Sequence, residues 1–419
     1  MKPNNEIYGC IGETLKHSFS KEIHNALADY DYRIIEIPKD KLLAFATERE
    51  FRAINVTIPY KELIMPYMDK IDSHAEAIGA VNTVVNREGK LFGYNTDFYG
   101  MSALIKRLGI SLSGRKVVIL GTGGTSKTAR AVAKAMGARE TVRVSREARE
   151  DAVDYDALYK YHTDAEVIIN TTPVGMYPKI FDSPVRLECF PSLIGAVDAV
   201  YNPLRTPFVL SAKERGISAE GGLYMLVAQG VRASEIFLDT EYPEGTLDSV
   251  YSKIAREKEN IVLIGMPASG KSTVGALLAN ALGRPLVDTD ALIAERCGKP
   301  ISDVFSDEGE AYFREVEAEV VREVSAMTGA VIATGGGAVL RADSVRALRE
   351  NGRLYFIDRP PQSLIPTSDR PTASTREAIE HRYSERYEIY TKAADVRVDA
   401  DALPKDVMDK ILSDFEVIR

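Results

Sequence analysis

Residues 265–273 of this 419-residue chain read GMPASGKST, a combination of glycines, a lysine and hydroxyl groups that can bind phosphate. The pattern G-x-x-x-x-G-K-[ST] is complete. In such a turn the backbone N–H groups surround the phosphates, the lysine reaches the β- and γ-phosphate oxygens, and the next hydroxyl binds Mg²⁺. An apolar run precedes the turn and a helical pattern follows it, which predicts a site for ATP and Mg²⁺. The predicted contacts come from Gly265, Ala268, Ser269, Gly270, Lys271, Ser272 and Thr273.

A second glycine-rich turn, LGTGGTS, lies far upstream at residues 120–126. It follows the apolar run KVVILG and opens a helical pattern, which is the order of elements in a dinucleotide-binding βα unit. Glycines there let the backbone approach a pyrophosphate at a helix N-terminus, where free N–H groups favour anions. A serine replaces the third glycine of the strict G-x-G-x-x-G pattern, and an ordinary tight turn is the alternative interpretation. The predicted contacts are Gly121, Gly123, Gly124, Thr125 and Ser126.

The residues after the next predicted strand distinguish between two dinucleotides. An acidic side chain there would accept hydrogen bonds from the ribose hydroxyls of NAD. The chain instead has Ser145 and Arg146 in the segment VSREAR, and a hydroxyl with a guanidinium suits the 2′-phosphate of NADP. Glu147 adds a negative charge that opposes this assignment, and the alternative is that Arg146 lies on a solvated surface.

Polar residues gather at the ends of predicted strands in the first hundred residues, in the segments KHSFS, NVTIPYKE, GAVNTV and YNTDFYG. Each segment alone could be turn chemistry, because Asn and Asp often satisfy their own backbone. Together they include Lys61 and Asp97, an ammonium and a carboxylate that suit proton transfer to a carbonyl oxygen during hydride transfer. The side chains that could hold substrate hydroxyls and a carboxylate are Ser18, Ser20, Asn55, Thr57 and Asn82.

Carboxylates and arginines also follow the GMPASGKST turn. Asp288 and Asp290, at the predicted end of the next strand, could serve Mg²⁺ and a substrate hydroxyl. Bare glycine backbone and several arginines could bind an anionic substrate and a transferring phosphoryl group, although any one arginine could instead be a surface residue. These residues are Arg314, Gly335, Gly336, Gly337, Arg370 and Arg386.

The motifs of residues 5–240 carry a family resemblance. The ordered set SFS, NVTIPYK, GAVNT, NTD, GTGGTS, NTTPVGM and GGLYMLVAQG resembles shikimate dehydrogenase. This resemblance implies NADPH-dependent reduction of 3-dehydroshikimate to shikimate, with Lys61 and Asp97 as the catalytic dyad. Lys21 departs from the family, which usually has proline there. The substrate contacts that the resemblance implies are Ser18, Ser20, Thr57, Asn82, Tyr201 and Gln229.

The motifs of residues 260–400, GMPASGKST, DTD, GEAYFREVE, TGGG, DRP and RYEIY, resemble shikimate kinase. The resemblance implies that Asp288 helps Ser272 hold Mg²⁺ and that Asp290 orients the shikimate hydroxyl. Arg314, the three glycines and Arg386 would bind the acid. Arg370 would lie in a lid near the phosphates, and the lid stretch PPQSLIPTSDRPTAS is short, with this arginine as its only basic residue.

Apolar runs alternate with helical patterns, which predicts an α/β protein with parallel sheets. We expect a substrate domain at 1–100, completed by a helix at 221–240, and a Rossmann-type NADP domain at 101–220. A polar linker short of apolar anchors is expected at 241–258. A P-loop kinase domain with a five-stranded parallel sheet would occupy 259–419.

The composition is that of a soluble globular protein, with 45% hydrophobic and 27% charged residues and a net charge of -8. An acidic chain is not expected to bind nucleic acid or an anionic membrane. Three scattered cysteines favour a reducing cytoplasm, and neither a signal peptide nor a transmembrane helix is expected.

The two turns together predict a bifunctional shikimate dehydrogenase–shikimate kinase that uses NADP, ATP and Mg²⁺. One alternative is a binding module that keeps shikimate pockets but has lost catalysis. Such a module would lack Lys61, Asp97, Lys271 or Asp290, and all four are present. The other alternative is an NAD-dependent quinate/shikimate dehydrogenase fused to a kinase, which the serine–arginine pair after the strand argues against. The oligomeric state stays open.

Overall fold

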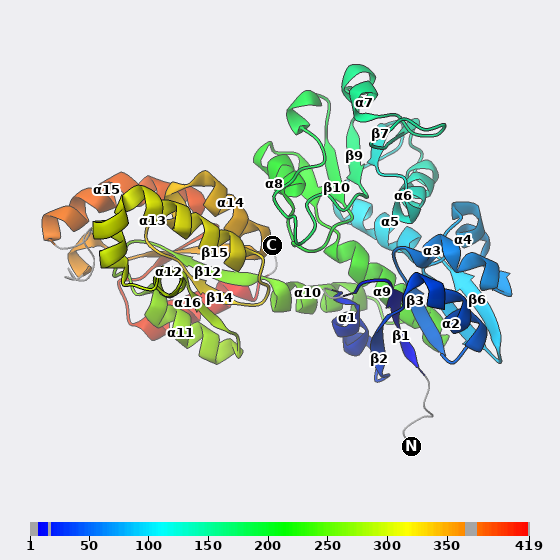
Figure 1. Cartoon of the computed structure of the whole chain (residues 1–419), viewed down its shortest axis with the longest axis horizontal. Helices are drawn as coiled ribbons and strands as arrows, with labels where there is room; N and C mark the ends of the chain where they lie inside the picture. The colour runs from blue at the N-terminus through cyan, green and yellow to red at the C-terminus, as the bar shows by residue number, and fades with distance from the viewer. Residues whose placement is uncertain (1–6, 16–17, 365–374, 418–419) are drawn as a thin grey trace. The chain divides into compact units, whose positions relative to one another are not determined.

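The computed structural model describes residues 7–15, 18–364 and 375–417, and the chain divides into two compact units, residues 1–254 and 255–419. Both units are α/β, with two sheets in the first and one in the second (Figure 1). The prediction of an α/β fold is therefore confirmed. Among the described residues, no helix combines the length and the apolarity that crossing a membrane requires.

The first sheet has six strands in the order β2-β1-β3-β5-β6-β4. β1 runs parallel to β2 and β3, whereas β5 runs antiparallel to β3 and β6. One face packs against α1 and α9, and the other packs against α2, α3 and α4. The strands are Tyr8–Gly12 (β1), Tyr32–Glu36 (β2), Ala53–Val56 (β3), Lys70–Ile71 (β4), Thr83–Arg87 (β5) and Lys90–Tyr94 (β6). The helices are Ser20–Leu27 (α1), Leu42–Glu48 (α2), Tyr60–Leu63 (α3), Ser73–Ile78 (α4) and Leu223–Leu238 (α9).

The second sheet is fully parallel, with the order β11-β10-β9-β7-β8. Helix α6 packs on one face, while α7 and α8 close the core on the other. Helix α5 packs against both α6 and α9, and so joins the two sheets of this unit. The strands are Lys116–Leu120 (β7), Glu140–Val144 (β8), Val167–Asn170 (β9), Gly195–Asp198 (β10) and Ser218–Glu220 (β11). The helices are Asp97–Arg107 (α5), Gly124–Ala135 (α6), Tyr155–Tyr161 (α7) and Pro207–Glu214 (α8).

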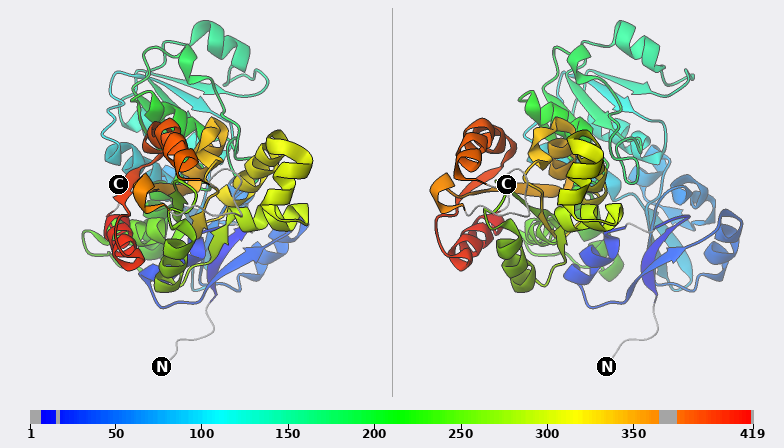
Figure 2. Two further views of the ribbon diagram at one scale, coloured as in Figure 1. Left: turned by 90° about the vertical axis from the view of Figure 1, so that its left-hand side faces the viewer. Right: turned by 60° about the vertical axis from the view of Figure 1, so that its left-hand side comes forward.

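The second unit contains a five-stranded parallel sheet of order β13-β14-β12-β15-β16, as predicted. Helices α11 and α16 cover one face, and α12 to α15 cover the other (Figure 2). The strands are Asn260–Ile264 (β12), Leu286–Asp288 (β13), Val331–Ala333 (β14), Gly352–Asp358 (β15) and Val396–Asp399 (β16). The helices are Lys271–Leu282 (α11), Thr289–Cys297 (α12), Ile301–Ser325 (α13), Ala342–Asn351 (α14), Arg376–Ala393 (α15) and Pro404–Phe415 (α16).

The segment expected to be a linker short of apolar anchors is mostly a helix, Thr246–Lys258 (α10), and the expectation was wrong on this point. Val250, Tyr251 and Ile254 are buried on it. A helix brings residues three and four apart to one face, so a mainly polar sequence can still present an apolar stripe. In the first unit, Arg107 lies 4.6 Å from the ring centroid of Tyr224 and 4.7 Å from that of Tyr251.

A buried carboxyl on α14 makes the stability of the second unit depend on pH. Glu350 is 1% exposed, and its Oε2 has no hydrogen-bond partner among the described residues. Burial raises the pKa of Glu350 from 4.5 to about 8, although the charge of Arg346 lowers it in part. The unfolded carboxyl ionises near its ordinary pKa while the folded one stays protonated, so stability should fall as the pH rises from 4.5 to about 8 and then level off.

Glu350→Gln should remove this decrease and raise the free energy of unfolding at pH 8 by on the order of 4 kcal/mol, with little change at pH 4.5. Calorimetric unfolding of the full chain between pH 4.5 and 8.5 measures the effect. Glu388→Gln, at an exposed position paired with Lys392 on α15, is the control and should leave the pH profile unchanged. An unaltered profile in Glu350→Gln would show that the buried carboxyl does not titrate in this range.

Candidate active sites

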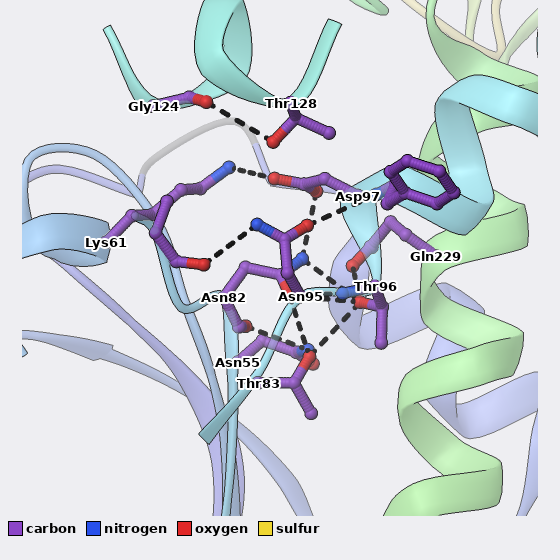
Figure 3. Close-up of polar contacts among 12 residues, drawn as sticks. Asn55, Lys61, Asn82, Thr83, Asn95, Thr96, Asp97, Gly124, Thr128 and Gln229 are labelled. Atoms are coloured by element: carbon purple, nitrogen blue, oxygen red, sulfur yellow. Dashed lines mark hydrogen bonds and ion pairs between the residues drawn. The ribbon is translucent and has the colours of Figure 1, made fainter. Parts of the chain in front are cut away.

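Lys61 and Asp97 form a close ion pair in the first unit. Lys61 lies on α3, Asp97 is the first residue of α5, and the Nζ–Oδ2 distance is 2.6 Å. Their side chains are only 13% and 7% exposed. Asn82 donates from Nδ2 to Asp97 Oδ1 at 2.9 Å, so both carboxylate oxygens are held (Figure 3). The structure therefore presents an ammonium whose position is fixed by a carboxylate that is itself fixed.

Hydrogen bonds among Asn55, Asn82, Thr83 and Thr96 form a network next to this pair. Asn82 Oδ1 accepts from the backbone N–H of Thr96 at 2.7 Å and from the hydroxyl of Thr83 at 3.1 Å. Asn55 accepts from the Tyr32 hydroxyl at 2.7 Å and donates to Thr83 Oγ1 at 3.2 Å. Asn55 is only 6% exposed, and its amide oxygen and nitrogen are both used inside the protein. Contact of Asn55 with substrate stays a prediction, and in the structure its side chain amide donates to Thr83.

Three other predicted substrate residues, Ser18, Ser20 and Tyr201, lie around the start of α1. Ser18 donates to Ser20 Oγ at 3.1 Å, and burial raises the pKa of Tyr201 to about 12, which a hydrogen bond with Ser18 opposes. Thr57 follows β3 and is half-buried. From α9, Gln229 Oε1 lies 3.4 Å from Thr96 Oγ1, which places it beside the Lys61–Asp97 network.

Cys10, a buried residue of β1, was not predicted as part of either group. Its thiol is close enough to interact electrostatically with Lys61, Asp97 and Tyr201. Burial raises the pKa of Cys10 to about 12, so the thiol is neutral. No sequence motif singles out Cys10, because the position of its side chain follows only from its place in the middle of β1.

The glycine turn of the first unit lies next to the dyad. Gly121 has φ of +111°, and a Cβ there would lie 2.8 Å from Thr171 Oγ1, so the position needs glycine. A Cβ on Gly123 would meet nothing within 4 Å, and one on Gly124 would lie 3.6 Å from Lys61 Cδ. The first turn of α6 carries no acidic residue. This open cradle at a helix N-terminus fits a pyrophosphate, and it adjoins the Lys61 side chain.

The other residues predicted to bind NADP differ from one another in burial and in hydrogen-bond partners. The Ser126 hydroxyl donates to the carbonyl oxygen of Gly121 at 2.6 Å and is buried, so it shapes the turn. Thr125 is half-buried within the turn. The Ser145 hydroxyl donates to the backbone carbonyl of Glu147, whereas Arg146 is exposed. Of the two residues predicted to contact the 2′-phosphate, Ser145 and Arg146, only Arg146 is exposed to solvent.

The P-loop of the second unit has the conformation that phosphate binding requires. Gly265, Ala268 and Gly270 have φ of +147°, +64° and +95°. Lys271 Nζ donates to the carbonyl oxygens of Gly265 and Met266 at 2.9 Å each. Ser269 Oγ is buried with no partner among the described residues, which leaves a hydroxyl for a phosphate oxygen. These donors fit ATP.

The residues predicted to hold Mg²⁺ are adjacent. Ser272 donates to Asp288 Oδ2 at 2.8 Å, and both side chains lie at the start of their helices. Mg²⁺ in phosphotransfer sites usually keeps several waters and takes one or two protein oxygens, so this pair fits the ion. Thr273, the next residue of α11, is exposed beside them.

The acceptor side of the kinase site is assembled around the three glycines. A Cβ on Gly337 would lie 1.8 Å from Arg314 Nη1, and one on Gly335 would lie 2.5 Å from Asp290 Oδ1. Arg386 donates from Nη1 to the carbonyl oxygen of Gly336 at 3.2 Å. The structure thus brings together every predicted acceptor-side residue that it describes.

The structure corrects one kinase prediction, leaves another outside the described residues and adds one residue that was missed. Asp290 lies in the first turn of α12 and not at the end of a strand, because β13 ends at Asp288, whose side chain caps the helix. Arg370 lies outside the described residues. Glu317 was missed: it accepts from Arg314 Nη1 at 2.6 Å, and burial raises its pKa. Its spacing of three residues after Arg314 on one helix was the available signal.

The two compact units of the chain match two different families of known proteins. Residues 10–84 match the family model for the shikimate dehydrogenase substrate binding domain. A shikimate dehydrogenase (NADP(+)) of Clostridium beijerinckii is 34% identical over 267 residues, which is 60% of this chain and 99% of that protein. The chain belongs to the shikimate dehydrogenase family. Residues 267–416 match the family model for shikimate kinase, so the predicted pairing of the two families is confirmed.

Solved structures agree with the family assignment of the first unit. Shikimate dehydrogenase 1 from Peptoclostridium difficile is 35% identical with a TM-score of 0.56, covering 59% of this chain and 97% of that one. The shikimate dehydrogenase of Thermus thermophilus, solved in complex with NADP(H) and shikimate, is 29% identical with a TM-score of 0.54 and covers 59% and 99% of the two chains. A chorismate mutase/shikimate dehydrogenase fusion from Clostridium acetobutylicum is 34% identical with a TM-score of 0.56, covering 60% and 98%.

Proposed function

We propose that this chain reduces 3-dehydroshikimate to shikimate with NADPH and then phosphorylates shikimate with ATP and Mg²⁺. The observation that carries the proposal is one group of suitable residues in each unit: the Lys61–Asp97 pair beside a glycine turn at a helix N-terminus, and a P-loop with the Asp290–Arg314–Arg386 group. Family membership of the first unit and the shikimate kinase match of the second support it.

In the dehydrogenase site, NADPH supplies a hydride when it is bound at the Gly121–Gly124 turn. A carbonyl oxygen gains negative charge as it is reduced, and the Lys61 ammonium can stabilise this charge and donate the proton. Asp97 accepts from Lys61 on one oxygen and from Asn82 on the other, so it orients the ammonium. Both side chains are mostly excluded from water, which strengthens the interaction. We assign the substrate contacts to Ser18, Ser20, Asn55, Thr57, Asn82, Tyr201 and Gln229.

In the kinase site, ATP supplies the phosphoryl group when it is bound at the P-loop. Lys271 would contact the phosphates in place of its carbonyl partners, and Ser272 and Asp288 would hold Mg²⁺. Asp290 orients the acceptor hydroxyl and takes its proton. Arg314 and Arg386, beside Gly335–Gly337, bind the carboxylate of shikimate, and Glu317 fixes Arg314. We also propose that both reactions take place in the cytoplasm, in keeping with the free cysteines Cys10, Cys189 and Cys297.

One purified sample tests the function. NADPH oxidation should depend on 3-dehydroshikimate, and ATP-dependent phosphate transfer should depend on shikimate. A binding module would bind shikimate without turnover in either assay. An NAD-dependent quinate enzyme would show higher kcat/KM with quinate and NAD than with shikimate and NADP. Either of these outcomes would contradict the proposal.

We expect Arg146→Ala to raise the KM for NADPH about tenfold while hardly changing the KM for NADH, because a charge-assisted contact to the 2′-phosphate contributes about 1.5–3 kcal/mol. Initial rates with each cofactor measure this. Arg139→Ala, an exposed arginine next to the opposite end of β8, is the matched control. Equal increases for NADPH and NADH would mean that Arg146 does not recognise the 2′-phosphate.

A further inference from the structure

Arg143 is a buried cation in the dehydrogenase unit that no motif explains. It lies on β8, the strand that leads to Ser145 and Arg146, and it is 6% exposed. Its strand neighbours Val142 and Val144 are apolar and buried. A guanidinium stays charged in a protein, and burying a charge is costly unless specific partners compensate. The contacts of Arg143 should therefore show what it does.

Every nitrogen of the Arg143 guanidinium has a partner. Nε donates to Ser126 Oγ at 3.1 Å, Nη2 donates to the carbonyl oxygen of Thr122 at 2.8 Å, and Nη1 pairs with the carboxylate of Asp151. The Ser126 hydroxyl in turn donates to the carbonyl oxygen of Gly121 at 2.6 Å. One buried side chain thus fixes both ends of the glycine turn.

Asp151 connects this arrangement to a second segment. Residues 145–151 follow β8 and fold back, with the N–H of Ser145 bonded to the carbonyl oxygen of Val153 at 2.9 Å and the N–H of Arg149 bonded to that of Ala152 at 2.8 Å. The Asp151 side chain is 53% exposed, and its ion pair with Arg143 ties the segment to the glycine turn. The turn would hold the pyrophosphate of NADP, and the segment would hold its 2′-phosphate.

We infer that Arg143 is a positioning residue for NADP: it fixes the distance between the pyrophosphate-binding turn and the 2′-phosphate-binding segment. This inference rests on the proposed NADP-dependent function. Arg143 acts through Thr122, Ser126 and Asp151, because each of its three nitrogens already contacts one of these residues. Its charge also lies beneath the N-terminus of α6, where positive potential favours a phosphate. This support matters for binding of the 2′-phosphate, because the Ser145 hydroxyl already donates to the backbone carbonyl of Glu147.

Binding measurements on the full chain test the inference without turnover. Arg143→Met removes the charge and keeps similar bulk. By calorimetry, it should weaken adenosine 2′,5′-bisphosphate and NADP⁺ about tenfold, and weaken AMP and NAD⁺ much less, since outer residues that orient a binding group typically contribute this much. Combined with Arg146→Ala, the loss should be less than the product of the two single losses, because both variants impair the same contact.

Lys116→Met is the matched control. Lys116 is also a buried cation of this sheet, 5% exposed and paired with Asp164 at 2.8 Å, but it lies at the start of β7, the opposite end from the glycine turn. It should reduce stability without changing the preference for the 2′-phosphate. If Arg143→Met does not fold, Asp151→Asn replaces it, with an expected loss of about threefold for the bisphosphate and retained kinase activity.

The outcomes separate this inference from the proposed function. A wild-type chain that binds the bisphosphate no better than AMP would overturn both. If Arg143→Met keeps the wild-type preference for the bisphosphate over AMP, the inference alone is overturned. If Arg143→Met does not fold, the same preference in Asp151→Asn overturns the inference alone. A loss of preference of the same size in Lys116→Met would also overturn it, because the effect would then reflect general destabilisation of the sheet.

Discussion

Lys61→Met should lower the turnover of the dehydrogenase by about two orders of magnitude or more, because the carbonyl oxygen would lose its proton donor. Methionine keeps the length of the side chain and removes only the ammonium. Asp97 would keep its hydrogen bond from Asn82, so the pocket should stay in place. Kinase activity should be unchanged, since its residues belong to the other compact unit. Steady-state rates of NADPH oxidation and of phosphate transfer on the same sample provide the measurement.

Lys127→Met is the control for this experiment. Lys127 lies on α6 and pairs with Glu62, the neighbour of Lys61, at 2.8 Å. It is therefore a lysine of the same region whose partner is not Asp97. Its turnover number should stay close to that of the wild type. If Lys61→Met retained near-normal turnover, the proton donor would have to be another group, and the assignment of the dyad would be wrong.

Local patterns were sufficient to predict both glycine-rich turns and the helices that follow them. The P-loop and the Gly121–Gly124 turn are continuous in sequence, and their geometry follows from glycine and helix-terminus chemistry. The second unit's sheet was also predictable, because apolar runs alternating with helical patterns produce parallel strands. Arg314, Gly335 and Asp290 come from distant segments, and it was the family resemblance that grouped them before the structure did.

The supporting residues could not be found from patterns of this kind. Thr83 and Arg143 make side-chain contacts between segments that are far apart in the chain, and nothing in their immediate sequence distinguishes them from core residues. Asn55 was predicted from its place at a strand end, and that pattern gave no sign of its partners Tyr32 and Thr83. Helix α10 was missed because its stripe of Val250, Tyr251 and Ile254 is short and lies among charged residues.

Asp290→Asn should lower kinase turnover by about two orders of magnitude while leaving ATP affinity within about twofold of the wild type. Asparagine has the same size as aspartate but cannot accept a proton from the acceptor hydroxyl. Asp290 lies beside Gly335 and near Glu317, on the acceptor side, whereas Lys271 and Ser269 form the phosphate side. The two sides should therefore separate in the kinetics, with kcat reduced and nucleotide binding retained. Titration with ATP by calorimetry and initial rates with shikimate provide the two measurements.

Two further variants make this result specific. Asp303→Asn, at an exposed position on α13, should behave as the wild type. Asp288→Asn should instead raise the Mg²⁺ concentration needed for half-maximal rate, because Asp288 pairs with Ser272 at the predicted metal position. The opposite pattern, with normal turnover in Asp290→Asn and loss of turnover in Asp288→Asn at saturating Mg²⁺, would assign the acceptor-side carboxylate to Asp288. Dehydrogenase activity of each variant reports whether the rest of the chain is intact, because that site lies in a separate compact unit.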